Sequence, residues 1–153
     1  MKPMQLIARN YTFTHRITNS TLDGITHEDS LTLPPNGGNS INWLVGHMLL
    51  SRDDVFERLG IERVWTDKEA TSAYDRGSAL LTDSGKAVEL STLLDMFNQT
   101  QPRLLEAIEH LNSEPTEDGK LEEAVAFYNF HESYHLGQIA ILRRVLGKES
   151  VIK

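Results

Sequence analysis

The sequence predicts an all-α protein, a four-helix bundle with a long crossover between its second and third helices. Apolar residues recur at spacings of three and four in four segments, which is the pattern of helices that bury one face. Clusters of Pro, Gly, Asn and Asp separate these segments, and no segment shows the alternation typical of a strand. Four amphipathic helices can bury their apolar faces against one another, which favours a bundle.

Length and composition favour a single domain over residues 1–153. The chain has 39% hydrophobic and 24% charged residues, which is ordinary for a globular protein. A net charge of −7 works against non-specific nucleic-acid binding, so no nucleic-acid partner is expected. The N-terminal residues lack a signal-peptide pattern and no apolar run matches a membrane span, so we expect a cytoplasmic protein with no membrane partner.

The first two helices are predicted at about residues 4–22 and 40–59, with a Pro- and Gly-rich break at residues 31–38 between them. The first half of the second helix, residues 41–50, is apolar nearly all round, which indicates burial on most sides. Its second half, residues 51–59, is amphipathic and is expected to emerge into solvent. The apolar stripe of the first helix is predicted to include Leu6, Phe13 and Ile17.

The third helix is predicted from about residue 90 to residue 112, and its apolar stripe keeps phase across Pro102, which favours one bent helix. The connection before it, residues 61–90, is long for a small helical domain, and such connections are usually functional or cross between parallel neighbours. Two interpretations stay open for it. It is either a lid over one end of the bundle, with Trp65 and Tyr74 packed down, or a plain surface connector.

The fourth helix, predicted from about Lys120 to Gly147, carries polar residues on the face that should point inward. A buried polar group costs on the order of 1–3 kcal/mol unless it is bound, so histidines in a core need a partner. The predicted inward stripe consists of Leu121, Ala124, Tyr128, His131, His135, Gln138, Leu142 and Val145.

His131 and His135 lie one helical turn apart, so both imidazoles can reach one metal ion. His47, in the buried half of the second helix, is the candidate third ligand, and Gly46 beside it would let another backbone approach closely. The chain has no cysteine, so thiolate ligands are excluded. Histidine-only coordination suits zinc, nickel, copper or iron, and three ligands leave a position open for water or substrate.

A site without a carboxylate leaves the charge of the metal uncompensated, so it would acidify a bound water or stabilise a bound thiolate. Gln138, on the same stripe one turn after His135, could orient that ligand or support a histidine from behind. No catalytic side chain is identified beyond it. The other three histidines are expected to be exposed or at the edge of the bundle, because nothing near His15 forms a ligand set, His27 lies in a polar connector, and His110 points away from the apolar stripe of the third helix.

The stretch from His131 to His135 also fits the zinc-protease pattern H-E-x-x-H, in which Glu132 would be the general base. Glu132 is about 100° around the helix from His131 and lies outside the predicted inward stripe. The 18 residues after His135 contain no histidine that could complete such a site. These features disfavour a protease.

Three stretches together resemble the DinB-like/YfiT-like family of metal-binding four-helix bundles: Asn42-Trp43-Leu44-Val45-Gly46-His47, then His131-Glu132-Ser133-Tyr134-His135-Leu136-Gly137-Gln138-Ile139, then Arg143-Arg144-Val145-Leu146-Gly147. The resemblance covers essentially the whole chain. It implies zinc or nickel bound by His47, His131 and His135, a homodimer, and a small-molecule substrate. Some relatives are transferases or isomerases that use low-molecular-weight thiols, and others are described as hydrolases.

Three hypotheses follow from the histidine set. The first is a metal-dependent enzyme of the thiol-dependent transferase or hydrolase type, in which Trp43 and Tyr128 shape an apolar pocket. The second is a metal-binding bundle without turnover, in which the ion is structural or regulatory. The third is a metal-free bundle whose histidines bond to Tyr128, Gln138 and water.

Overall fold

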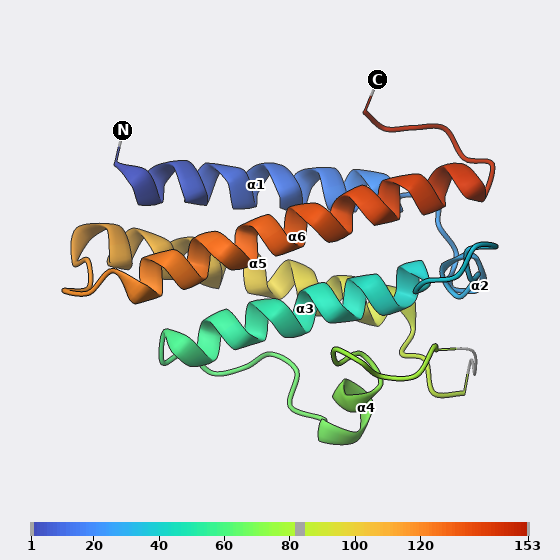
Figure 1. The fold of residues 1–153 in the computed structure, drawn as a ribbon, viewed down its shortest axis with the longest axis horizontal. Helices are drawn as coiled ribbons and strands as arrows, with labels where there is room; N and C mark the ends of the chain where they lie inside the picture. Colours follow the sequence, from blue (N-terminus) through green and yellow to red (C-terminus); the bar gives the residue numbers. More distant parts are fainter. Residues whose placement is uncertain (1, 82–84, 153) are drawn as a thin grey trace.

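The computed structural model describes residues 2–81 and 85–152, and the regular elements in these ranges are all helices (Figure 1). The prediction of an all-α bundle is therefore confirmed. None of the helices in the described ranges is long and apolar enough to cross a membrane. Four long helices build the bundle and two short ones lie in its connections: α1 (Pro3–Leu22), α2 (His27–Ser30), α3 (Ile41–Arg58), α4 (Lys68–Ser72), α5 (Leu90–Ser113) and α6 (Lys120–Val145).

The four long helices form a closed ring of neighbours. Each of α1 and α3 packs against both α5 and α6. Helices α1 and α6 run in one direction, and α3 and α5 run in the other (Figure 1). The chain between α3 and α5 therefore crosses between two parallel helices, as predicted, and Pro102 lies inside a continuous α5.

The crossover packs along the outer side of α3 and not over an end of the bundle (Figure 1). The buried Asp53 carboxylate accepts hydrogen bonds from the main-chain nitrogens of Val64 and Trp65 at 2.8 and 2.9 Å. The Tyr74 ring lies directly on Gly46, where an added Cβ would come within 2.2 Å of it. Trp65 and Tyr74 are buried, so they do pack down as the lid interpretation expected. Residues 82–84 of the predicted crossover lie outside the described residues.

Two apolar clusters make up the core, one around the first half of α3 and one around its second half. Between them lies a layer of buried polar side chains that join α1, α3, α5 and α6. The expectation that residues 51–59 emerge into solvent was wrong, because Arg52 and Asp53 are buried with polar partners. The layer includes Thr14, Arg52, Thr100 and Glu132.

The predicted stripe of α1 was also wrong, since Leu6 and Phe13 are half exposed. Helix α1 packs through threonines instead. The hydroxyl of Thr21 donates to the Ile17 carbonyl one turn earlier, which satisfies it within the helix, and the hydroxyl of Thr14 donates to the buried Glu132 carboxylate. The buried residues of α1 are Met4, Tyr11, Thr14, Thr18, Thr21 and Leu22.

The inward face of α6 is rotated from the predicted stripe. His135 and Leu142 are buried as expected, but Val145 is exposed, and His131 is only partly buried. The rotation brings Glu132 inside, where it finds partners in the polar layer. It leaves the histidine-bearing side of α6 at the edge of the core, facing α3. The buried residues of α6 are Val125, Asn129, Glu132, His135, Leu136, Ile139 and Leu142.

Candidate metal centre

The three predicted histidines come together between α3 and α6. His47 extends from α3, and His131 and His135 extend from α6. One nitrogen from each ring lies within 4.8 Å of the other two, and the Nε2 atoms of His131 and His135 are 3.0 Å apart. The three rings meet edge to face, with centroids 4.4 to 5.1 Å apart.

The second nitrogen of two of these rings is bound to an oxygen that can only accept. The Nδ1 atom of His47 lies 2.9 Å from the main-chain oxygen of Tyr74. The Nδ1 atom of His135 lies 2.7 Å from Oε1 of Gln138, the residue expected to support the site. A neutral imidazole carries one proton, and these contacts place it on Nδ1 in both rings. The Nε2 atoms therefore present lone pairs to the centre.

The hydroxyl of Ser51 determines which nitrogen of the third ring, that of His131, carries the proton. It donates to the main-chain oxygen of His47 at 2.9 Å, so its remaining lone pairs can accept. The Nδ1 atom of His131 lies 3.3 Å from this hydroxyl oxygen and donates to it. All three histidines thus share the Nδ1-protonated form in which the other nitrogen is free to bind a metal.

This donor set fits a divalent metal ion. Two unprotonated Nε2 atoms at 3.0 Å repel each other unless a positive charge lies between them. Nitrogen ligands at the usual zinc–imidazole distance in a tetrahedral site are about 3.3 Å apart, close to the observed spacing. The residues present can therefore hold a divalent metal ion of the kind that imidazole ligands suit, such as zinc or nickel.

Burial lowers the pKa of all three imidazoles from the usual value, because the charged form loses its hydration. For His131 the pKa falls to about 4, and the charges of the neighbouring His135 and His47 add to the effect of burial. The rings are consequently neutral near pH 7. Neutral imidazole is the form that binds a metal.

Aromatic rings enclose the histidines. Trp43 stacks on His47 with ring centroids 4.5 Å apart, and its indole nitrogen donates to Ser78 of the crossover at 2.9 Å. The Tyr128 ring lies 6.3 Å from His131, and the Tyr134 ring lies 5.2 Å from His135. These three rings border the centre, and the Tyr134 ring is exposed.

Glu132 is buried, contrary to the expectation that it would lie outside the inward face. Its carboxylate accepts two hydrogen bonds from Arg52 at 2.8 Å and one from Thr14 at 2.9 Å. A carboxylate committed to three donors is not available as a general base for a metal-bound water. Glu132 therefore does not serve as the general base that the H-E-x-x-H protease pattern requires.

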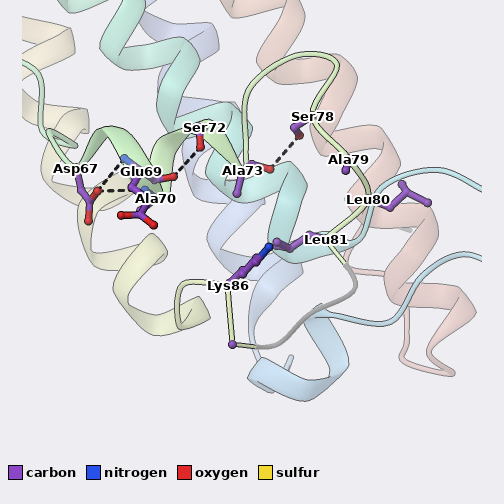
Figure 2. Close-up of a pocket in the computed structure, with 11 residues that line it drawn as sticks. Asp67, Glu69, Ala70, Ser72, Ala73, Ser78, Ala79, Leu80, Leu81 and Lys86 are labelled. Atoms are coloured by element: carbon purple, nitrogen blue, oxygen red, sulfur yellow. Dashed lines mark hydrogen bonds between the residues drawn. The ribbon is translucent and has the colours of Figure 1, made fainter.

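A cavity of about 780 Å³ lies elsewhere, within the crossover (Figure 2). Small and polar side chains from α4 and the following loop line it, and Ser78 is its link to Trp43. None of the three clustered histidines lines this cavity. Among the described residues, the group of side chains that could hold a metal ion lies at the histidines and not at this cavity.

The remaining histidines serve packing or capping. His15 is partly buried and stacks on Phe97 with ring centroids 5.2 Å apart. His27 accepts a hydrogen bond from the main-chain nitrogen of Leu90 at the start of α5. His110 is exposed, as expected. The sequence reasoning missed Ser51 and the Tyr74 carbonyl. Ser51 lies one turn after His47 on the same helical face, a spacing that could have identified it.

The model of the DinB superfamily matches residues 10–139, a span that includes all three clustered histidines. The chain belongs to the DinB superfamily. No curated protein matches the sequence. The fold of this DinB-superfamily protein matches the crystal structure of a conserved protein from Enterococcus faecalis with a TM-score of 0.68. The match covers 97% of this chain and 99% of the other at 18% identity, so it shows a shared fold alone.

Proposed function

We propose that this protein is a metal-dependent enzyme whose three-histidine centre activates a small nucleophile, either a thiol or water. One observation carries the proposal. The three imidazoles present unprotonated nitrogens to one another, while a separate hydrogen bond engages the second nitrogen of each ring. Such second hydrogen bonds orient the ligands of metal sites and increase their basicity.

A zinc or nickel ion held by three neutral imidazoles, with no carboxylate to offset its charge, would lower the pKa of a bound thiol or water. The protein's own residues orient and shield this centre. Gln138 and the Tyr74 carbonyl hold the rings of His135 and His47 in place. The rings of Trp43 and Tyr128 lie beside His47 and His131.

A small pocket lined by Gln138 is the proposed place for the substrate. The three histidines do not line it themselves, and Gln138, which contacts His135, joins it to the centre. It has a volume of about 220 Å³, and both α3 and α6 contribute apolar side chains to it, including Leu44 and Ile141. Gly37 and Gly38 form its third wall. A pocket of this size and lining suits a small molecule with an apolar part. Family resemblance favours a low-molecular-weight thiol as one reactant, in a transferase or hydrolase type of reaction.

The alternative is a metal-binding bundle without turnover. Its support is that the ligands come from two helices, so an ion would join α3 to α6 and stabilise the fold by the free energy of binding. The same histidines would serve both functions. Only a response to substrate separates them.

Metal analysis of untagged protein purified without chelators comes first, followed by cobalt substitution and titration with low-molecular-weight thiols. The enzyme proposal expects one metal per chain, a cobalt spectrum that changes with thiol, and turnover that His135→Ala abolishes. His110→Ala, at an exposed histidine, is the matched control and should change none of these. If metal raises the melting temperature and has no other effect, the metal-binding bundle without turnover is favoured. Absence of bound metal would overturn both the enzyme proposal and this alternative.

A further inference from the structure

The pocket that Gln138 lines is uncharged. It has a volume of about 220 Å³ and lies between α3, α6 and the turn that precedes α3. Its described lining consists of apolar side chains, two glycines and two carboxamides, and includes no acidic or basic side chain. A ligand in this pocket therefore has to find its polar partners among carboxamide and main-chain groups.

The two ends of the Gln138 carboxamide have different surroundings. Its oxygen Oε1 lies 2.7 Å from Nδ1 of His135 and accepts the proton of that ring. Its nitrogen Nε2 donates no hydrogen bond to any residue in the ranges 2–81 and 85–152. A carboxamide nitrogen carries two N–H groups, which lose free energy if a ligand displaces their water without accepting from them. The nitrogen is thus the part of Gln138 that remains to bind a ligand.

Asn39, at the end of the turn before α3, brings a second carboxamide to the pocket. It is partly buried, and its side chain makes no hydrogen bond within the described part of the chain. Asn42, one turn further on, is the contrast, since its amide donates to the Val88 carbonyl at 2.9 Å and accepts from Tyr74 at 2.7 Å. Asn39 and Gln138 can therefore both offer an amide to a ligand.

A neutral carbonyl oxygen is the group that this lining suits best. It accepts from an amide N–H without needing a counter-charge. A carboxylate would lose part of its hydration and meet no cation among the described lining residues. An ammonium donor would find Oε1 of Gln138 already engaged by His135. Leu44, Ile141 and Leu142 supply apolar surface for a hydrocarbon group beside the carbonyl.

We propose that this pocket binds an uncharged carbonyl group of the substrate, that of an amide, ester or ketone, through a hydrogen bond from Nε2 of Gln138. Gln138 then determines specificity, because it admits a carbonyl attached to an apolar group and disfavours a carboxylate. That the carbonyl compound is the substrate rests on the proposed function. The chemistry that the pocket recognises comes from its own lining.

Gln138 also connects the pocket to the metal centre. Hydrogen bonds that share one amide group strengthen one another, so a carbonyl bound at Nε2 should tighten the contact between Oε1 and His135. A tighter contact increases the basicity of the ring nitrogen that faces the centre. The carbonyl compound and the metal should consequently increase each other's affinity by the same factor.

Nuclear magnetic resonance on the native chain tests the recognition directly, because the side-chain N–H groups of Gln138 give signals of their own. Pentan-2-one, a neutral carbonyl with an apolar tail, should shift these signals in both the metal-free and the zinc-loaded protein. Pentanoate has a similar shape but a charge, so it should bind roughly tenfold more weakly. Absence of these shifts, or equal binding of the two probes, would overturn the proposal.

Gln138→Glu separates the two ends of the side chain. It keeps an oxygen for Nδ1 of His135, so competition with a chromogenic chelator should show metal affinity at least equal to the native value. It replaces the N–H donors with an oxygen that repels the carbonyl, so the dissociation constant for pentan-2-one should rise roughly tenfold. Gln99→Glu adds the same charge at an exposed site on α5 and should alter neither. Native affinity for the probe in Gln138→Glu would contradict the role of Nε2.

Zinc affinity measured with the pocket filled tests the connection through Gln138. Saturating pentan-2-one should raise the zinc affinity of the native protein by roughly fivefold, the lower end of the usual coupling between two sites. The increase should be absent from Gln138→Glu, whereas a ligand that only stabilised the fold would raise zinc affinity in both proteins. Unchanged zinc affinity in the native protein would overturn this connection.

The same measurements distinguish this inference from the proposed function. If the protein binds no metal but pentan-2-one still shifts the Gln138 signals, the proposed function fails and carbonyl recognition stands. If metal and the response to thiols are present but the carbonyl probe does not bind, only the present inference fails.

Discussion

Arg52 of α3 and Glu132 of α6 form a two-pronged ion pair in the centre of the bundle. Nε and one terminal nitrogen of the guanidinium each lie 2.8 Å from a different carboxylate oxygen, and the two side chains are 1% and 2% exposed. Arg52 directly follows Ser51, and Glu132 directly follows His131. The pair therefore fixes how α3 and α6 lie against each other next to the three histidines.

Loss of one member of this pair should destabilise the protein strongly. Glu132→Leu leaves a buried guanidinium unpaired, with an expected cost of about 3–5 kcal/mol in the free energy of unfolding. Arg52→Met combined with Glu132→Leu should recover most of that loss, because no charge stays buried. Urea unfolding measures both. Glu57→Gln, which removes an exposed ion pair with Arg63, should change stability by at most about 1 kcal/mol. Equal losses in the single and double variants would contradict this account.

Gln138→Leu should weaken metal binding without unfolding the protein. The variant removes the oxygen that accepts from Nδ1 of His135, so the ring loses its fixed orientation. Loss of such a support typically costs 10- to 100-fold in metal affinity, roughly the fall expected in a competition assay with a chromogenic chelator. Gln99→Leu makes the same exchange at an exposed site on α5 and serves as the control. Unchanged affinity in Gln138→Leu would show that the contact does not position His135.

Gly46→Ala should disturb the centre through the crossover. The new methyl group would come within 2.2 Å of the Tyr74 ring, so the ring and its main chain must shift. Overpacking of this kind costs about 1–3 kcal/mol. The shift also moves the carbonyl that accepts from His47, so metal affinity should fall together with stability. A variant with lower stability but native metal affinity would show that the Tyr74 carbonyl is dispensable.

Acid should destabilise the metal-free protein partly through His15. Burial, with the nearby charge of Arg52 as a second cause, lowers the pKa of His15 from 6.5 to about 4. The unfolded chain therefore takes up this proton at a higher pH than the folded chain does. The contribution of His15 is fully present above about pH 6.5 and is lost as the pH falls toward about 4.

The variant His15→Gln has no titrating ring and should flatten this dependence. With chelator present, the melting temperature of the native protein should fall more steeply than that of His15→Gln as the pH drops from 7 toward 4, while His110→Gln should keep the native profile. Parallel profiles for the native chain and His15→Gln would show that His15 titrates alike in the folded and unfolded states.

The sequence predicted the clustered histidines because their spacing depends only on helical geometry. His131 and His135 must share a side of any helix, and His47 belonged to a segment that was apolar on most sides. The rotation of α6 was not predictable in the same way. It depends on Glu132 entering the core, and its partner Arg52 lies 80 positions away in sequence.

Local sequence patterns also led to wrong predictions of which side chains are buried in α1 and in the second half of α3. Leu6 and Phe13 suggested an inward face, but threonines occupy the buried side of α1, where Thr21 bonds within the helix and Thr14 donates to Glu132. Arg52 and Asp53 resembled solvent-facing charges, although both find buried partners in distant segments. Every residue has a main-chain oxygen, so no sequence pattern identifies that of Tyr74 as the partner of His47. This contact is seen only in the structure.

The contact between the crossover and His47 passes through a backbone carbonyl, which every amino acid possesses. Side chains beyond Tyr74 can therefore diverge during evolution while the imidazole keeps its orientation. The support for the His47 ring thus depends on the path of the crossover main chain and not on which side chains follow Tyr74.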